Sequence, residues 1–173
     1  TLERANLLER SIGGPPSHPP IPIGVWTPFQ AGDRWETPPL DDSGRYRRSI
    51  YTYIKRSIPY PQFAAFDAPS REVCASRRLT SNTPVQALTM LNEQTYLDAA
   101  ESLAGQLNQS LSGNSFRSVM EKAWLEQTGC RPSERQLAIL NAYYEDQQRD
   151  RGVQTALRDL AVLLINLDEA IHY

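Results

Sequence analysis

The sequence is poor in the residues that most often bind metals or form disulfides. Its 173 residues include two cysteines, Cys74 and Cys130, and two histidines, His18 and His172. None of them stands in a CxxC, CxxCH or HxxxH spacing, and a structural zinc site normally takes four Cys or His ligands in close pairs. We therefore expect no zinc site and no covalently attached haem in this chain. The two cysteines can either pair in an oxidising compartment or remain as two buried thiols.

Long apolar runs and a large excess of one charge are also missing. No apolar run approaches the length of about 18 residues that a membrane-spanning helix needs. The first ten residues, TLERANLLER, have neither the apolar centre of a signal peptide nor an initiator methionine, which indicates the interior of a longer protein. The net charge of −2 argues against binding of polyanions over the whole surface. Hydrophobic residues make up 40% and charged residues 22%, as in ordinary globular domains.

Proline is abundant in only one part of the chain. Eleven of the 13 prolines lie within residues 15–69, so this part cannot be a helical bundle. We predict the end of a helix over 1–14, stopped by Gly13 and Gly14, and a Pro-rich extended arm over 15–45. The arm contains Trp26 and Trp35. Because disordered segments are poor in aromatic residues, we expect the arm to pack on a surface.

A basic and aromatic segment followed by a polar loop occupies residues 46–82. Residues 43–66 contain five Lys or Arg and no acid. Ile50, Thr52 and Ile54 alternate with polar or aromatic residues, which predicts one short strand or ribbon near 48–56, with a helix as the rival interpretation.

From residue 83 onward the pattern is helical. Thr83-Pro84-Val85-Gln86 and Ser133-Glu134-Arg135-Gln136 are two capping boxes. Apolar residues at spacings of three or four predict a bundle of four to five helices over about 83–171, and the last of them, about 153–170, is apolar around much of its circumference. Such a helix is usually central. We therefore predict a mainly α fold in which 83–173 is the helical bundle of a single domain spanning 1–173.

Two groups of side chains are candidates for binding or chemistry. The first lies within Arg45–Arg56 and can either form an anion-binding surface or pair with the acidic helical part. The second lies in the polar loop, where Asp67 or Glu72 can act as acid or base and an arginine as an anion clamp. The structural alternative for the second group, which we favour, is a salt-bridge network that holds the segment against the first helix. The candidate residues are Arg47, Arg48, Tyr51, Lys55, Arg56, Asp67, Arg71, Glu72, Arg77 and Arg78.

Several segments resemble a known family. The run YRRSIYTYIKRSIPYPQFAAFDAPSREVC, followed by RRLTSNTPVQALTMLN, resembles the C-terminal domain of unknown function of exported, cytochrome-c-containing proteins of planctomycete type, the planctomycete cytochrome C associated domain family. The segments TGCRPSERQL and LLINLDEAIHY resemble that family's closing helices. The resemblance is most specific over 45–92. It implies that the chain is the C-terminal portion of a larger domain, that haem lies in a separate module, and that this chain holds no cofactor of its own.

The resemblance also implies export to the periplasm or cell surface. We expect a non-catalytic interaction or scaffolding domain whose partners are other domains of the same polypeptide, a surface protein or an anionic polysaccharide. We expect no nucleic-acid partner and assign no catalytic residue. Two alternatives stay open. One is a polysaccharide-active hydrolase or lyase that uses Asp67, Glu72 and Arg78, and the other is nucleic-acid or anionic-polymer binding through Arg45–Arg56.

Overall fold

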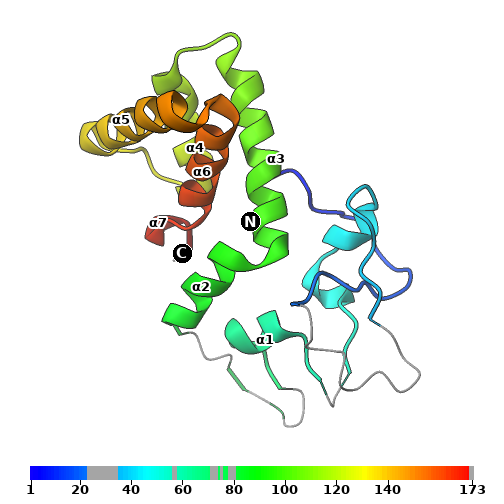
Figure 1. The fold of residues 1–173 in the computed structure, drawn as a ribbon. Coiled ribbons are helices and arrows are strands. Elements are labelled where there is room, and N and C mark those ends of the chain that lie inside the picture. Colours follow the sequence, from blue (N-terminus) through cyan, green and yellow to red (C-terminus); the bar gives the residue numbers. More distant parts are fainter. Residues whose placement is uncertain (23–34, 56–57, 71–73, 75, 78–80, 172–173) are drawn as a thin grey trace. The chain divides into compact units, whose positions relative to one another are not determined.

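The structure is a computed structural model that describes residues 1–22, 35–55, 58–70, 74, 76–77 and 81–171 (Figure 1). The mainly α fold predicted from the sequence is confirmed. Within the described residues, no helix is both long enough and apolar enough to cross a bilayer. The elements are η2 (Ser43–Tyr46), η3 (Ser49–Tyr51), α1 (Pro61–Ala65), α2 (Pro84–Asn92), α3 (Gln94–Leu111), α4 (Phe116–Thr128), α5 (Glu134–Arg151), α6 (Val153–Ile165) and α7 (Asp168–Ile171), where η denotes a 3-10 helix.

The chain divides into two compact units. The helical unit consists of Thr1–Leu7 together with Tyr96–Tyr173. The proline-rich unit is the intervening stretch, Leu8–Thr95, which contains α1 and α2.

The helical unit is built around α6. Leu157, Leu160 and Leu164 of this helix are fully buried, as is Met120 of α4. Figure 1 shows α4, α5 and α6 side by side, and α6 contacts both neighbours and α7. The predicted central position of the helix that starts near 153 is therefore confirmed.

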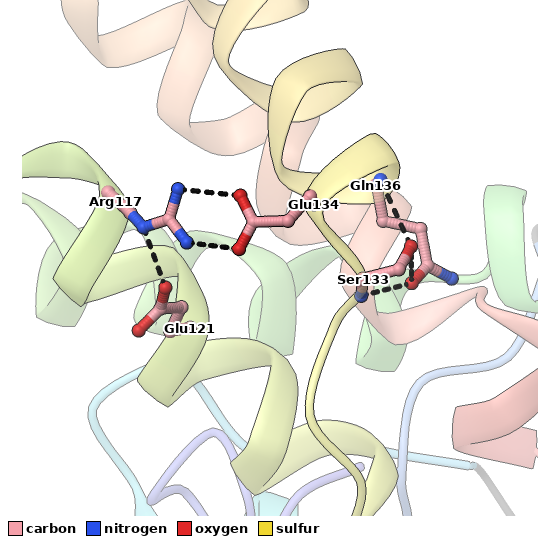
Figure 2. Close-up of polar contacts among 5 residues, drawn as sticks. All are labelled: Arg117, Glu121, Ser133, Glu134 and Gln136. Carbon is pink, nitrogen blue, oxygen red and sulfur yellow. Dashed lines mark hydrogen bonds and ion pairs between the residues drawn. The ribbon is translucent and has the colours of Figure 1, made fainter.

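Local signals set most helix ends. Ser133 caps α5, since its Oγ accepts from the Gln136 backbone N–H at 3.3 Å while Gln136 Oε1 accepts from the Ser133 N–H at 2.8 Å (Figure 2). Thr83 and Gln86 make the same reciprocal pair at the start of α2. Gly129 ends α4 with a φ of 76°, a left-handed conformation that suits glycine.

The prediction of one continuous helix over about 153–170 is wrong at Asn166. There α6 ends, and α7 begins at Asp168. The Asn166 side chain donates to the carbonyl of Val162 at 2.8 Å, and its backbone N–H is shared between the carbonyls of Val162 and Leu163. An asparagine side chain that bonds to the preceding turn competes with the helical ladder, which explains the break.

Residues 1–7 form a single helical turn closed by a Schellman motif. The Leu7 N–H donates to the Leu2 carbonyl at 3.0 Å and the Asn6 N–H to the Glu3 carbonyl at 3.1 Å, with Asn6 at a φ of 56°. The helical geometry thus ends at Asn6, ahead of the Gly13-Gly14 pair. The Ala5 carbonyl accepts from Ser102 Oγ and Gln106 Nε2, both at 2.8 Å, which fastens this turn to α3.

The strand or ribbon predicted near 48–56 is not formed in the described part of that stretch. Ser49–Tyr51 is a 3-10 turn, and β-pairing there is limited to isolated bridges, such as that of Thr52 with Ser17. Ser17 exchanges backbone bonds with Tyr51 and Tyr53, at 2.7 and 2.8 Å. Prolines at 15, 16, 19 and 20 lack the N–H groups that would continue the ladder along the arm, so the pairing stops after one residue.

Candidate functional site

Hydrogen bonds of the Asp67 side chain connect the loop after α1 to the start of α2. One oxygen of its carboxylate, Oδ2, accepts from the Ser81 N–H at 2.8 Å and from Ser81 Oγ at 2.6 Å. Gln86 Nε2 lies 3.4 Å from the same oxygen and 3.1 Å from Ser81 Oγ. Gln86 is 7% exposed although it is polar. The carboxylate therefore belongs to a polar network that positions the first turn of α2.

The other members of the predicted acid and arginine cluster lie outside the described residues. These are Arg71, Glu72 and Arg78, and the same holds for Arg56 of the basic segment. Arg77 is exposed. Cys74 and Cys130 are both unpaired and exposed, whereas the sequence left open a disulfide or two buried thiols.

Two arginines of the basic segment, Arg45 and Arg47, make contacts within the chain. The guanidinium group of Arg47 donates to the carbonyls of Pro15, at 2.6 Å, and Gly13, and it stacks over the Tyr51 ring at 4.0 Å. Arg45 is 9% exposed and donates to the Pro38 carbonyl at 2.9 Å. The structure thus brings Arg47 and Tyr51 together. Arg48 is exposed and Lys55 is half-buried.

An aromatic cluster holds the described part of the Pro-rich arm in place. The Trp35 ring stacks on Tyr60 at 5.8 Å, and its indole N–H donates to the Pro19 carbonyl at 2.8 Å. His18 is half-buried between Trp35 and Tyr53, and its ring centroid lies 5.1 and 5.0 Å from theirs. Trp26 lies outside the described residues.

The α2 helix exposes its apolar side. Val85 is 60% exposed, Leu88 59% and Leu91 45%, whereas Gln86 and Met90 are buried. On a helix of 100° per residue, Leu88 lies nearly opposite both Gln86 and Met90. No residue of α2 is charged. We call Val85, Leu88 and Leu91 the α2 face.

A groove runs beside the α2 face. It encloses about 480 Å³, and its walls are mainly apolar. Its lining combines Val85, Leu88, Thr89, Asn92 and Glu93 with Pro20, Pro22, Tyr60, Pro61 and Gln62.

The polar side chains around this groove already have hydrogen-bond partners, with one exception. Thr89 Oγ1 donates to the Val85 carbonyl and Asn92 Nδ2 to the Leu88 carbonyl, both at 2.8 Å. Glu93 accepts from the Thr95 N–H at 2.9 Å. Gln62 Nε2 is buried without a partner. Binding at this groove would therefore be driven mainly by removal of apolar surface from water.

The apolar spacing predicted a helix from residue 83 onward, but it did not indicate that Val85, Leu88 and Leu91 would be exposed. The capping box turns Gln86 back toward Thr83, and the contact of Gln86 with Asp67, 19 residues away, sets which side of the helix faces the polar loop. The residues on the opposite side of the helix then point away from that loop.

A second polar cluster joins α4 and α5 in the helical unit (Figure 2). Arg117 makes a bidentate ion pair with the Glu134 carboxylate, in which Nη1 lies 2.8 Å from Oε2. Its Nε lies 2.9 Å from Oε1 of Glu121. The hydrogen bonds and charge of Arg117 lower the pKa of Glu134, and those of Glu134 raise the pKa of Arg117. All three side chains are exposed. The cluster thus acts as a surface clamp between two helices.

Within the part of the chain that the structure describes, no three His, Cys, Asp or Glu side chains gather in a way that could hold a metal ion.

The chain was compared with protein families, curated proteins and solved structures. No curated protein and no solved structure is significantly similar to the chain. The family described as PSD1, protein of unknown function (DUF1553), matches residues 1–144. The matched residues include the α2 face, the Asp67 network and the basic segment. The chain therefore belongs to the PSD1 (DUF1553) family of proteins of unknown function.

Proposed function

We propose that this chain is a non-catalytic interaction domain that docks an apolar surface of a protein partner on the α2 face. By the resemblance described above, the partner is another domain of an exported, cytochrome-c-associated polypeptide or a surface protein. Haem belongs, in this proposal, to a separate module, and the present chain contributes contacts only.

The exposure of the α2 face is the observation that carries the proposal. Three large apolar side chains at spacings of three stand 45–60% exposed on a helix without charge, next to a groove with proline walls. Single exposed apolar residues are ordinary, whereas a contiguous apolar patch is typical of an interaction site. Burial of these side chains by a partner would contribute roughly 25 cal/mol for each Å² of apolar surface covered, against which the cost of association is set.

The polar contacts of the alternative sites also favour this interpretation. One carboxylate oxygen of Asp67, Oδ2, accepts hydrogen bonds from Ser81 and Gln86. Arg47, the centre of the possible anion site, donates through its two terminal guanidinium nitrogens to the carbonyls of Gly13 and Pro15. Both groups thus support the fold of their own unit.

Photo-cross-linking tests the proposal. A benzophenone amino acid at position 88 of the protein produced in its native host should give one recurrent cross-linked peptide from a protein surface. The matched control is position 139, because Ile139 on α5 is 57% exposed, close to the 59% of Leu88. Equal yields from both positions, or a product only with the chain's own residues 23–34, would contradict the proposal.

A further inference from the structure

We infer that the groove beside the α2 face binds a short proline-rich segment in polyproline geometry, with one backbone carbonyl of the segment accepting a hydrogen bond from Gln62. The inference rests on the proposed function, because it names the kind of partner segment that this surface takes. The observation behind it is the Gln62 side chain, whose Nε2 is buried and has no hydrogen-bond partner among the described residues.

The groove runs along the whole of α2. All of its lining residues belong to the proline-rich unit. The wall on the α2 side follows the three-and-four spacing of one side of a helix, with Val85, Leu88, Thr89, Asn92 and Glu93. This stretch of helix rises about 12 Å. Because a polyproline segment rises about 3.1 Å per residue, about four of its residues lie along the wall.

The opposite wall comes from the Pro-rich arm and the start of α1. The arm provides Pro20 and Pro22, and the start of α1, which contacts α2, provides Tyr60, Pro61 and Gln62. Proline rings fix the backbone angle φ of three of these residues, which makes this wall stiff. A stiff groove loses little conformational entropy when a segment binds.

The unpaired donor of Gln62 favours an extended segment over a helix. A buried donor without an acceptor is unfavourable. The terminal torsion of a glutamine side chain has only broad preferences, so the amide can turn toward an acceptor that enters the groove. The carbonyls inside a helix are already bonded to N–H groups of the next turn, whereas those of an extended segment are free to accept.

The apolar walls favour proline in that segment. Each ordinary residue of an extended peptide brings a backbone N–H that needs an acceptor once it leaves water. Proline brings a carbonyl and an apolar ring but no N–H, which matches a groove of mainly apolar walls with an unpaired donor. The polyproline helix is also formed before binding, which lowers the entropic cost.

Nuclear magnetic resonance of the 173-residue chain tests the inference directly. The probe is hexaproline with blocked ends, titrated to about 10 mM because a short segment binds weakly. It should shift the side-chain amide signals of Gln62 and the backbone signals of Leu88 and Thr89, and the shifts should saturate. A blocked peptide of the same length made of alternating glycine and serine offers carbonyls without rings and should leave these signals unchanged.

Two variants separate a binding role of Gln62 from a structural one. Gln62→Met keeps the length of the side chain but removes the donor, so it should weaken hexaproline binding by about fivefold, as expected for one lost hydrogen bond. Its urea unfolding midpoint should not fall, because the buried amide has no partner to lose. Gln148→Met, at an exposed glutamine of α5, should bind hexaproline like the wild type.

The outcomes separate this inference from the proposed function. The absence of saturable shifts with hexaproline, or equal affinity of the wild type and Gln62→Met, overturns the inference. If position 88 nevertheless cross-links to a peptide of another protein, the proposed function stands and the docked surface is of another kind. If hexaproline binds in the expected way while position 88 cross-links to nothing in the host, the inference holds for the groove and the proposed function fails.

Discussion

Asp67 combines an uncommon backbone conformation with a dense set of hydrogen bonds. Its φ is 54°, a left-handed value that asparagine and aspartate tolerate better than most residues with a Cβ atom. Its carboxylate receives donors from Ser81 and Gln86. This one residue thus fixes both the direction of the loop after α1 and the rotation of α2.

Replacing Asp67 should lower stability. We expect Asp67→Ala to reduce the free energy of unfolding by about 2 kcal/mol, because the donors of Ser81 and Gln86 lose their acceptor and alanine is strained at this φ. Asp67→Asn should lose about half as much, since asparagine tolerates the conformation and keeps an acceptor. Urea unfolding of the two variants measures the difference. An unchanged unfolding midpoint for Asp67→Ala would show that the network contributes nothing to stability.

At the scale of single residues, the sequence predicted which side chains have a structural role better than it predicted their hydrogen-bond partners. It marked Asp67 and the arginines as a structural group, and Asp67 does lie in a polar network. The acceptors of Arg47, by contrast, are backbone carbonyls of Gly13 and Pro15, more than thirty residues away in the sequence. Backbone carbonyls exist at every residue, so no pattern of side chains could single out these two.

Among the elements, α6 makes the largest contribution to the core of its unit. Ala156, Leu157, Leu160, Ala161 and Leu164 have no exposed surface. We expect Leu160→Ala to lower the free energy of unfolding by about 3 kcal/mol, through lost burial and the cavity left behind. Ile139→Ala on α5, where the side chain is 57% exposed, should change it by well under 1 kcal/mol. Similar losses for the two variants in urea unfolding would contradict the central position of α6.

The clamp between α4 and α5 makes stability depend on pH. Because Arg117 lowers the pKa of Glu134, the pair stabilises the fold above the unfolded-state pKa of glutamate, about 4.3, and this contribution is lost as the pH falls through the lowered folded value. We expect Glu134→Gln to lower the melting temperature slightly at pH 7, by at most about 2 °C, since both side chains are exposed.

Calorimetry at two pH values checks this prediction. The melting temperatures of the wild type and Glu134→Gln should converge once the carboxylate is protonated. They should also converge at pH 7 in about 1 M salt, which screens exposed charges. A difference that persists under both conditions would mean that Glu134 acts through packing instead of charge.

Helix ends were predictable, whereas helix rotation and the short elements were not. The boxes at Thr83 and Ser133 are set within four residues of sequence, and the structure has both. The rotation of α2 depends on a contact between Gln86 and Asp67, 19 residues apart. The expected strand near 48–56 failed because its pairing partner is the proline-rich arm, which the alternation of Ile50, Thr52 and Ile54 does not reveal.

For the molecule as a whole, the two units differ in how much apolar surface they bury. Most of the buried apolar side chains in the described residues belong to the helical unit. The described residues of the proline-rich unit contribute Tyr46, Ile58, Tyr60 and Met90. Backbone bonds supported by few buried side chains open more easily.

Hydrogen exchange followed by mass spectrometry should therefore separate the units. We expect the slowest-exchanging amides in α6 and the adjoining part of α5, and exchange at least about tenfold faster in α1 and α2. The comparison uses peptides from one digest of the same sample, so pH and temperature are shared. Equal protection of α2 and α6 would mean that the two units open together.

The hydrogen bonds between Ala5 and α3 can form only late in synthesis on the ribosome. The Ala5 carbonyl emerges 97 residues before Ser102 and 101 before Gln106. At about 5–20 residues per second, it waits roughly 5–20 s for its donors. All of Leu8–Thr95 is made during that wait, so the proline-rich unit has the chance to fold while the first turn of the chain is still unattached.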